Sequence, residues 1–208
     1  MKILRRAFLR GSISQPIKVP GMVHGRMVRP NVAGAVPVKV YESSIKEIPG
    51  AKVVWNQGFL GVVADTEWDA IKASRQLKVE WSDAQPPFPD QATLYHHIRS
   101  APIRKREFGG KTAGDVDAAF KGVARVIEAE YEWPFQSHAS MGPACTVADV
   151  NDDQVTVWTG SQKPHSTREG VATILGVPAE KVHAMWVPGP GSYGRNDAGD
   201  AAVDAALL

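Results

Sequence analysis

Residues 182–208 read VHAMWVPGPGSYGRNDAGDAAVDAALL, and three patterns follow one another in this stretch. Val182, Ala184 and Trp186 recur at every second position, as in a β-strand. Residues 188–194 form a glycine-rich loop, and residues 200–208 are rich in alanine and leucine, as in a helix. A strand, a glycine loop and a helix in this order predict an α/β (α+β) fold. Glycines let the backbone approach a ligand closely, and the start of a helix offers unpaired N–H groups to an anion.

The glycine loop at 189–194 fits more than one pattern. As Gly-x-Gly-x-x-Gly it matches the dinucleotide fingerprint, which also needs an acidic residue about 20 positions further on, beyond the end of this chain. As x-Gly-Ser-x-Gly it imitates the nucleophile elbow of a serine hydrolase around Ser192, but Pro190 stands at the first glycine and no downstream histidine follows. A tight structural turn is the third interpretation, and a nicotinamide-binding domain stays open as an alternative.

Working outward from this loop, hydrophobic periodicity and turn residues predict further elements. Expected strands cover 52–55, 59–64, 78–81, 127–133 and 182–186, and a hairpin joins 145–150 to 154–158. A helix over 67–77 begins with a capping box of Thr66 and Asp69, and Asp115 caps a short helix through Phe120. A second capping box, Ser166 with Glu169, is expected to open a helix that ends at Gly176.

The chain is divided by one clear linker. Residues 82–89 read SDAQPPFP, and proline removes backbone donors and disfavours both helix and sheet. We therefore place a domain boundary there. The dense positive charge at 104–106 and Lys111 is interpreted as an exposed loop. Because residues 200–208 carry no capping residue or terminal glycine, we expect the chain to be the front of a longer protein whose last helix leaves apolar surface exposed.

Composition excludes several classes of protein. The chain has 208 residues, 43% of them hydrophobic and 22% charged, which is typical of a folded protein rather than a disordered one. A net charge of +2 with scattered basic residues gives no support for a nucleic-acid partner. No run reaches the roughly 18 apolar residues of a transmembrane helix. Cys145 is the single cysteine, which excludes an internal disulfide, a Cys-rich zinc site and an iron–sulfur cluster held by this chain alone.

The histidines and the N-terminus add two expectations. None of the six histidines has a metal-binding spacing, so no protein-ligated metal is predicted. His138 and His165 are instead expected to satisfy buried backbone groups. Arg5 to Arg10 reads RRAFLR, which resembles a twin-arginine export motif and suggests the bacterial periplasm, but the apolar part of such a signal is absent. Without a signal, the expected compartment is the cytoplasm.

Four separated stretches lead to a resemblance. They are PGMVHGRMVRP at 20–30, WPFQSHASMGP at 133–143, TGSQKPH at 159–165, and the glycine loop followed by Asp200-Ala201-Ala202. Together with GVVA at 61–64 and the expected helix after it, they resemble the molybdopterin-binding large subunit of the xanthine dehydrogenase and aldehyde oxidase family. The similarity is to a branch whose glycine loop carries Tyr rather than Phe, and it covers nearly the whole chain from Pro20.

The resemblance implies a division of the chain and a set of cofactor-binding residues. A basic N-terminus at 1–19 precedes a partial hammerhead-like domain at 20–81, the linker at 82–89 and the first segment of a molybdopterin-binding domain at 90–208. Gln136 matches a glutamine whose neutral amide approaches an oxygen ligand of molybdenum. The glycine loop is implied to contact the cofactor through Gly191, Ser192, Tyr193 and Gly194. Molybdenum would be held by the pterin and not by protein side chains.

The resemblance also implies a function and partners. The complete enzyme would be an oxidoreductase that oxidises an aldehyde or hydroxylates an N-heterocycle with water as the oxygen source, passing electrons to an iron–sulfur subunit. A missing C-terminal half, or a chain that carries it, would supply the general-base glutamate, which nothing here matches, so this chain is expected to be inactive alone. The loop at Asn196–Asp200 departs from the family pattern. The alternative is a non-catalytic fragment or interaction module that packs against another chain.

Overall fold

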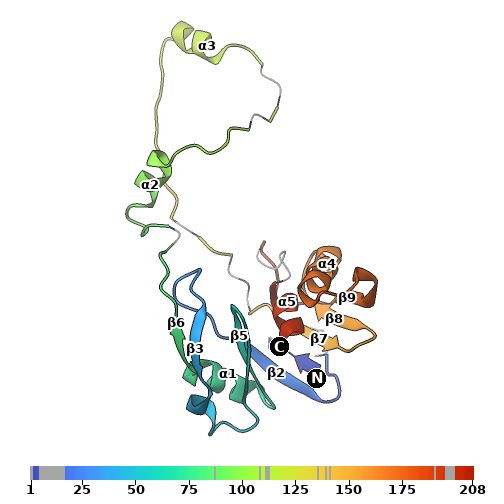
Figure 1. Ribbon diagram of the computed structural model, residues 1–208. Helices are drawn as coiled ribbons and strands as arrows, with labels where there is room; N and C mark the ends of the chain where they lie inside the picture. The colour runs from blue at the N-terminus through green and yellow to red at the C-terminus, as the bar shows by residue number, and fades with distance from the viewer. Residues whose placement is uncertain are drawn as a thin grey trace. The chain divides into compact units, whose positions relative to one another are not determined.

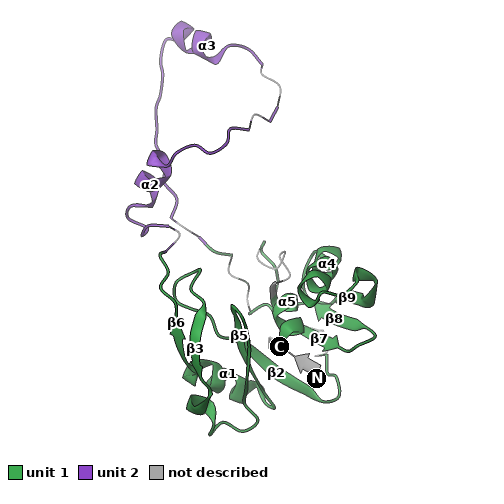
Figure 2. Cartoon of the chain, viewed as in Figure 1, with its two compact units in different colours: residues 1–85, 137–208 green, residues 86–136 purple. Residues whose placement is uncertain are grey.

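The computed structural model describes residues 2–4, 17–86, 88–107, 109–110, 113–134, 136–138, 140, 142–189, 191–194 and 200–208. The twin-arginine-like motif, Lys111 and the departure at 196–199 lie outside the described residues. The chain forms two compact units, one from Met1–Gln85 with Ser137–Leu208 and one from Pro86–Gln136 (Figure 2). The predicted domain ranges remain a prediction.

A seven-stranded sheet runs through the first unit in the order β4-β5-β2-β1-β7-β8-β9 (Figure 1). Its strands are β1 Lys2–Leu4, β2 Met22–Met27, β4 Lys52–Asn56, β5 Phe59–Ala64, β7 Thr146–Val150, β8 Val155–Thr159 and β9 Val182–Trp186. The β1–β2 and β8–β9 pairs are parallel, and the other neighbours are antiparallel. Strands β3 Pro37–Tyr41 and β6 Lys78–Trp81 form a separate antiparallel pair. This mixed sheet with helices confirms the predicted α/β (α+β) class.

Strand β5 is covered on both faces. Because side chains alternate along a strand, Leu60 and Val62 point to one face and Gly61 and Val63 to the other. The first pair belongs to a core with residues of helix α1 (Glu67–Gln76) and of the 3-10 helix η1 (Glu42–Ile45). On the opposite face, Val63 is buried against Leu208, the last residue of the chain. The capping residue of α1 is Thr66, whose hydroxyl accepts the N–H of Asp69 at 3.1 Å, as predicted.

The β7–β8–β9 part of the sheet carries two helices on one face. Helices α4 (Pro164–Leu175) and α5 (Asp200–Leu207) pack apolar residues against this face. The core consists of Ala148, Val155, Val157, Val171, Ala172, Val182, Ala202, Ala205 and Ala206. The 3-10 helix η2 (Ala179–Lys181) leads from α4 into β9. The hairpin of β7 and β8 and the C-cap of α4 at Gly176, with a φ of 68°, were both predicted correctly.

The expected second capping box is wrong. Helix α4 begins at Pro164, with Lys163 as its N-cap, so Ser166 lies inside the first turn rather than before it. Proline suits the first helical position because its missing N–H would have no partner there.

The expected exposure of the last helix is wrong too. Ala202 and Ala205 of α5 are 0% and 1% exposed, because this helix packs on the sheet.

The second unit contains helices α2 (Leu94–Ser100) and α3 (Val116–Gly122), the latter capped by Asp115 as predicted. None of its described residues is buried. The half-buried strand expected at 127–133 is absent: these residues form neither helix nor strand, and Ile127 is 78% exposed. Alternation gives a strand only where a neighbouring strand supplies hydrogen bonds, and in the described part of the chain none pairs with this segment.

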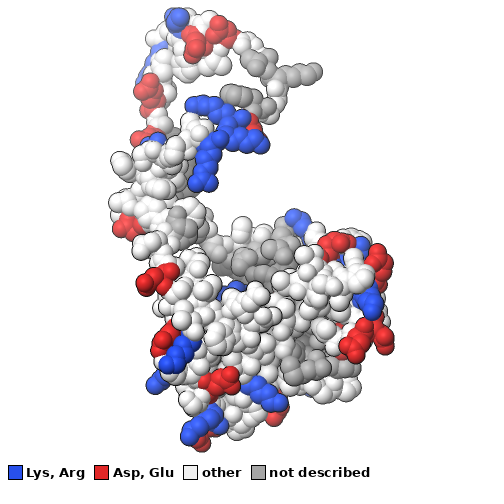
Figure 3. Space-filling view, viewed as in Figure 1, with Lys and Arg blue, Asp and Glu red and all other residues white. Residues whose placement is uncertain are grey.

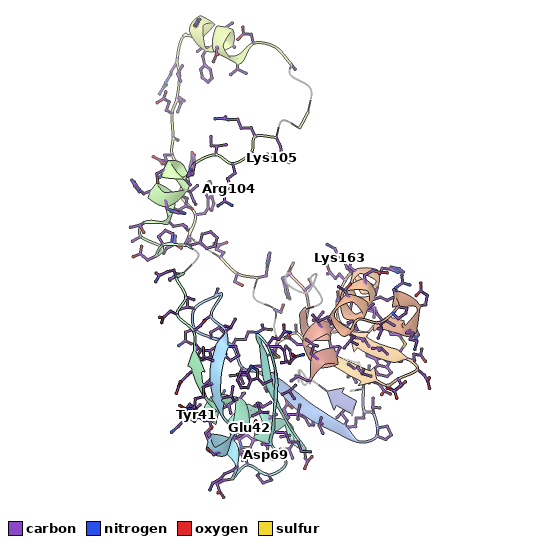
Figure 4. All side chains as sticks on the ribbon, in the orientation of Figure 1. Tyr41, Glu42, Asp69, Arg104, Lys105 and Lys163 are labelled. Atoms are coloured by element: carbon purple, nitrogen blue, oxygen red, sulfur yellow. The ribbon has the colours of Figure 1, made fainter. Side chains whose placement is uncertain are left out.

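Charged side chains lie on the surface of both units (Figure 3). Arg104, Lys105 and Arg106 are exposed, as expected for a solvated loop, and the first two are marked in Figure 4. Within the described residues, no helix has the length and apolar character needed to cross a membrane.

Candidate functional site

Three segments leave the sheet at one edge. Thr159, at the end of β8, pairs with Trp186, at the end of the parallel strand β9. It also pairs with Thr146, the first residue of the antiparallel strand β7. The segment that leads into β7, the loop after β8 and the glycine loop after β9 therefore share this edge. In mixed and parallel sheets, the carboxyl ends of parallel strands are the usual place for a ligand.

Buried hydroxyl groups fix the loop that follows β8. Thr146 Oγ1 lies 3.2 Å from Thr159 Oγ1, which also accepts the N–H of Ser161 at 3.2 Å. Ser161 is fully buried, and its own hydroxyl accepts the N–H of Lys163 at 3.2 Å. The segment held by these hydrogen bonds leads directly into Pro164 at the start of α4. The loop is thus a defined structure, and Lys163 stands at the N-terminus of the helix (Figure 4).

The glycine loop holds an unusual backbone conformation. Gly191, Tyr193 and Gly194 have φ angles of 91°, 49° and 89°. Ser192 is buried, and its hydroxyl accepts the N–H of Gly194 at 3.2 Å. The carbonyl oxygen of Ser192 accepts a hydrogen bond from Ser140 Oγ at 3.3 Å. Tyrosine rarely adopts the left-handed backbone conformation. The hydrogen bonds of Ser192 therefore hold the loop in a specific shape.

The glycines of this loop lie against neighbours from the other two segments. A Cβ placed on Gly194 would lie 2.8 Å from Nε2 of His138, and one on Gly189 would lie 3.4 Å from the Cα of Gly160. A Cβ on Gly191 would lie 2.8 Å from the ring of Tyr193, whose side chain is 62% exposed. The structure therefore brings His138 and Gly160, from two motifs that the sequence places far apart, against glycines of the loop.

The predicted residues fall into two groups. Gly191, Ser192, Tyr193 and Gly194 lie together at this edge. Gln136 is exposed and is the last residue of the Pro86–Gln136 unit. His138 and His165 are both exposed, so the expectation that they satisfy buried backbone groups is wrong. His138 instead covers a glycine of the loop.

A second glutamine lies near the glycine loop. Gln162 is exposed and lies in the loop after β8, between the buried Ser161 and the start of α4. The signal was available in the sequence, because a polar side chain between a strand end and a proline that starts a helix is placed at the ligand edge of the sheet. Gln162 belongs to the TGSQKPH motif that carries part of the family resemblance, but no role was predicted for it.

The groups gathered here suit a polar or anionic ligand. The first turn of α4 contains no acidic residue, and a helix start favours negative charge. The glycines permit close approach of a ligand to the backbone. Across the described residues, no group of three or more His, Cys, Asp or Glu side chains is arranged to hold a metal ion. These residues fit a cofactor bound through its own oxygen and phosphate groups.

The second unit has a depression of about 480 Å³ of its own, lined by Gln91, Tyr95, His96, Arg99, Glu132 and Pro134. Its charged groups are already paired, since Arg99 Nη2 lies 3.2 Å from Oε1 of Glu132 and also contacts Glu130. The hydroxyl of Tyr95 contacts the backbone of Trp133. None of the predicted site residues lines this depression.

Comparison with known proteins gives consistent results. The family described as molybdopterin cofactor-binding domain matches residues 100–207. A nicotinate dehydrogenase subunit of Pseudomonas putida is 37% identical over 201 residues, which are 92% of this chain and 17% of that protein. A probable xanthine dehydrogenase subunit of Bacillus subtilis is 32% identical over 152 residues, 71% of this chain and 20% of that protein. The chain thus spans a fifth or less of the length of these two relatives.

A solved structure supports the fold. The crystal structure of quinoline 2-oxidoreductase from Pseudomonas putida 86 matches with a TM-score of 0.65 at 17% identity, covering 89% of this chain and 29% of that one. At this identity the likeness concerns the fold.

Proposed function

Because the chain belongs to the molybdopterin cofactor-binding domain family, we propose that the edge formed by the three loops is part of a molybdenum-cofactor site. The enzyme would oxidise an aldehyde or hydroxylate an N-heterocycle, with water as the source of oxygen. The observation that carries this proposal is the convergence of three motifs on one edge, through the His138–Gly194 and Ser140–Ser192 contacts and the close approach of Gly189 to Gly160.

The glycine loop would bind and orient the cofactor. Gly191 is exposed, so its backbone can come close to the ligand without an intervening side chain. Ser192 would act indirectly, by holding the shape of the loop. Its hydroxyl oxygen accepts a hydrogen bond from the N–H of Gly194, and its carbonyl oxygen accepts one from the hydroxyl of Ser140. Tyr193 would pack its exposed ring beside the cofactor and exclude water. The bound cofactor would supply the redox chemistry, and the protein would supply position and electrostatics.

A glutamine amide would donate a hydrogen bond to the cofactor without adding charge. Gln136 is the residue that the family resemblance proposes for this role. Gln162 is the residue that the geometry favours, because its loop adjoins the glycine loop within the same unit. The two assignments are distinguishable by mutation, and we treat Gln162 as the competing candidate.

Other polypeptide would complete the enzyme. The two relatives named above are both called subunits, which supports a partner subunit. In our proposal this partner would carry the iron–sulfur clusters and accept the electrons. The remaining part of the pocket and the general base would come from residues that have no match in this chain. The site described above would then contribute cofactor binding, and not the proton transfer.

The experiment measures pterin and molybdenum per chain after capture, with all co-purifying polypeptides retained, from a host that makes the cofactor. We expect about one pterin per folded chain in the unmodified protein. Tyr193→Ala and one of the two variants Gln136→Ala and Gln162→Ala should lower this occupancy at least threefold. Gln76→Ala is the matched control, because Gln76 is an exposed glutamine at the end of α1. Equal occupancy in all variants would contradict the assigned roles.

A second candidate function is an interaction module without catalysis. One observation favours it: the Pro86–Gln136 unit exposes Phe88, Ile98, Ile103, Phe120, Ile127, Tyr131 and Trp133, each by more than half. Apolar surface of this kind marks interaction sites. Self-association on gel filtration by protein that contains neither pterin nor metal would support this function over the first one.

A further inference from the structure

We propose that His138 is a positioning residue that holds the glycine loop in its cofactor-binding shape. This inference rests on the proposed function and adds a role for a side chain that the comparisons do not assign. His138 and Gly194 are separated by 56 positions in the sequence, yet the imidazole occupies the space in which a Cβ of residue 194 would lie.

The contact is close and specific. From the position of a Cβ on Gly194, Nε2 of His138 would be 2.8 Å away, and Cδ2 and Cε1 would each be 3.1 Å away. The Nε2 corner of the ring is therefore directed at this point. The φ of 89° at Gly194 disfavours a side chain there, and the imidazole occupies the space that a Cβ would take, so a side chain at this position would also displace the ring of His138.

The same short segment holds the loop at a second point. Ser140 donates its hydroxyl hydrogen to the carbonyl oxygen of Ser192, at 3.3 Å. The loop is thus fixed at residue 192 by a hydrogen bond and at residue 194 by packing. Between them lies Tyr193, a non-glycine residue with a positive φ of 49°. An unfavourable conformation of this kind persists only where the surroundings determine it.

His138 has little part in the core. It is exposed, and it belongs to none of the buried clusters found among the described residues of this unit. Its removal should therefore leave the fold intact while the loop gains freedom. A cofactor that binds only one loop conformation then binds with an affinity reduced by the fraction of chains in that conformation.

The first test compares His138→Ala, His138→Gln and His183→Ala in the full chain, captured with its partners from a cofactor-producing host. Glutamine can place its amide where Nε2 lies, so it is the conservative variant. His183 is an exposed histidine of β9 in the same unit and serves as the control. We expect His138→Ala to lower the pterin content and raise the rate of pterin release at least threefold. His138→Gln should recover at least half of that loss, and His183→Ala should change neither. Unchanged pterin retention in His138→Ala would overturn the proposal.

A second test does not depend on cofactor. Gly194→Ala, His138→Ala and the double variant are compared by their midpoints of thermal unfolding in protein from a host that lacks the cofactor. Because the added methyl group of Gly194→Ala meets the imidazole, its destabilisation should shrink by at least a third in the His138→Ala background. If the two substitutions change the unfolding midpoint additively, the contact between His138 and Gly194 is contradicted. If the unmodified protein holds no pterin but this coupling is found, the proposed function fails while the His138–Gly194 packing stands.

Discussion

Arg29 Nη2 lies 2.7 Å from Oδ2 of Asp204, so a residue just after β2 is joined to helix α5 across 175 positions of sequence. The carboxylate side chain is 11% exposed and the guanidinium side chain is 62% exposed. Helix α5 follows the glycine loop in the chain. This ion pair therefore joins the helix after the loop to the segment after β2.

Arg29→Ala should destabilise the protein by about 1–2 kcal/mol, because a nearly buried carboxylate loses a charged hydrogen-bond partner. The measurement is the free energy of unfolding in urea. Arg168→Ala is the control: its pair with the adjacent Glu169 is exposed, and we expect a change within about 0.5 kcal/mol. A loss for Arg29→Ala as small as that of the control would show that the pair does not fasten α5.

Gly61→Ala tests the packing of Leu208 on β5. A Cβ at this position would lie 2.4 Å from Cδ2 of Leu208 and 3.1 Å from the carbonyl oxygen of Arg26. Overpacking of this kind costs about 1–3 kcal/mol of unfolding free energy. Gly58→Ala is the matched control, because its Cβ would meet only Val36 at an ordinary 3.7 Å. Equal stability of the two variants would argue against the observed position of Leu208.

Local sequence patterns predicted much of the first unit, which contains the seven-stranded sheet. The Thr66 cap, the β7–β8 hairpin and the left-handed Gly176 each depend on residues within a few positions of one another. Strand β3 was missed because it begins with Pro37 and pairs with β6, which follows it only after two other strands and a helix. The strand expected at 127–133 is absent for a related reason. The alternation of apolar and polar residues is present, but alternation does not show whether another strand pairs with the segment.

The contacts of Asp69 in the first turn of α1 predict an acid-dependent stability. The hydrogen bond from Lys72, with a further one from Thr66, lowers the pKa of Asp69 below its ordinary value. A carboxyl with a lowered pKa stabilises the fold above the pKa of the unfolded state, and that contribution is lost as pH falls through the folded pKa. Asp69→Asn should therefore lose less stability than the unmodified protein between about pH 5 and pH 2, when unfolding is followed by circular dichroism. Parallel curves for the two proteins would contradict this.

Hydrogen exchange tests the absence of a strand at 127–133. Strand β8 is paired on both sides, with β7 and β9, whereas the 127–133 segment pairs with no strand among the described residues. The amides of this segment should exchange at least about 100-fold faster than those of β8, measured by mass spectrometry on peptides that separate the two regions. Comparable protection would mean that a strand forms there in solution.

Part of the proposed site has a local signal in the sequence. The glycine loop was singled out because it lies between a predicted strand and a predicted helix, and in the structure it follows the carboxyl end of β9, beside the end of β8. That Gly191 to Gly194 bind a cofactor stays a prediction. The neighbours of the glycine loop could not be identified in this way, because the contact between His138 and Gly194 depends on how β7, β8 and β9 pair. Gln162 was given no role, although its place between a strand end and the proline that begins α4 is a local signal; its nearness to the glycine loop depends on the pairing of β8 with β9.

The most direct test of the central claim is the number of molybdenum atoms and pterin molecules per chain, measured on the full chain captured with its partners from a cofactor-producing host. A ratio close to one for both, lowered by Tyr193→Ala but not by the control Gln76→Ala, is the result that the proposed cofactor site predicts. Folded chain that carries neither molybdenum nor pterin, with every co-purifying polypeptide retained, would contradict it.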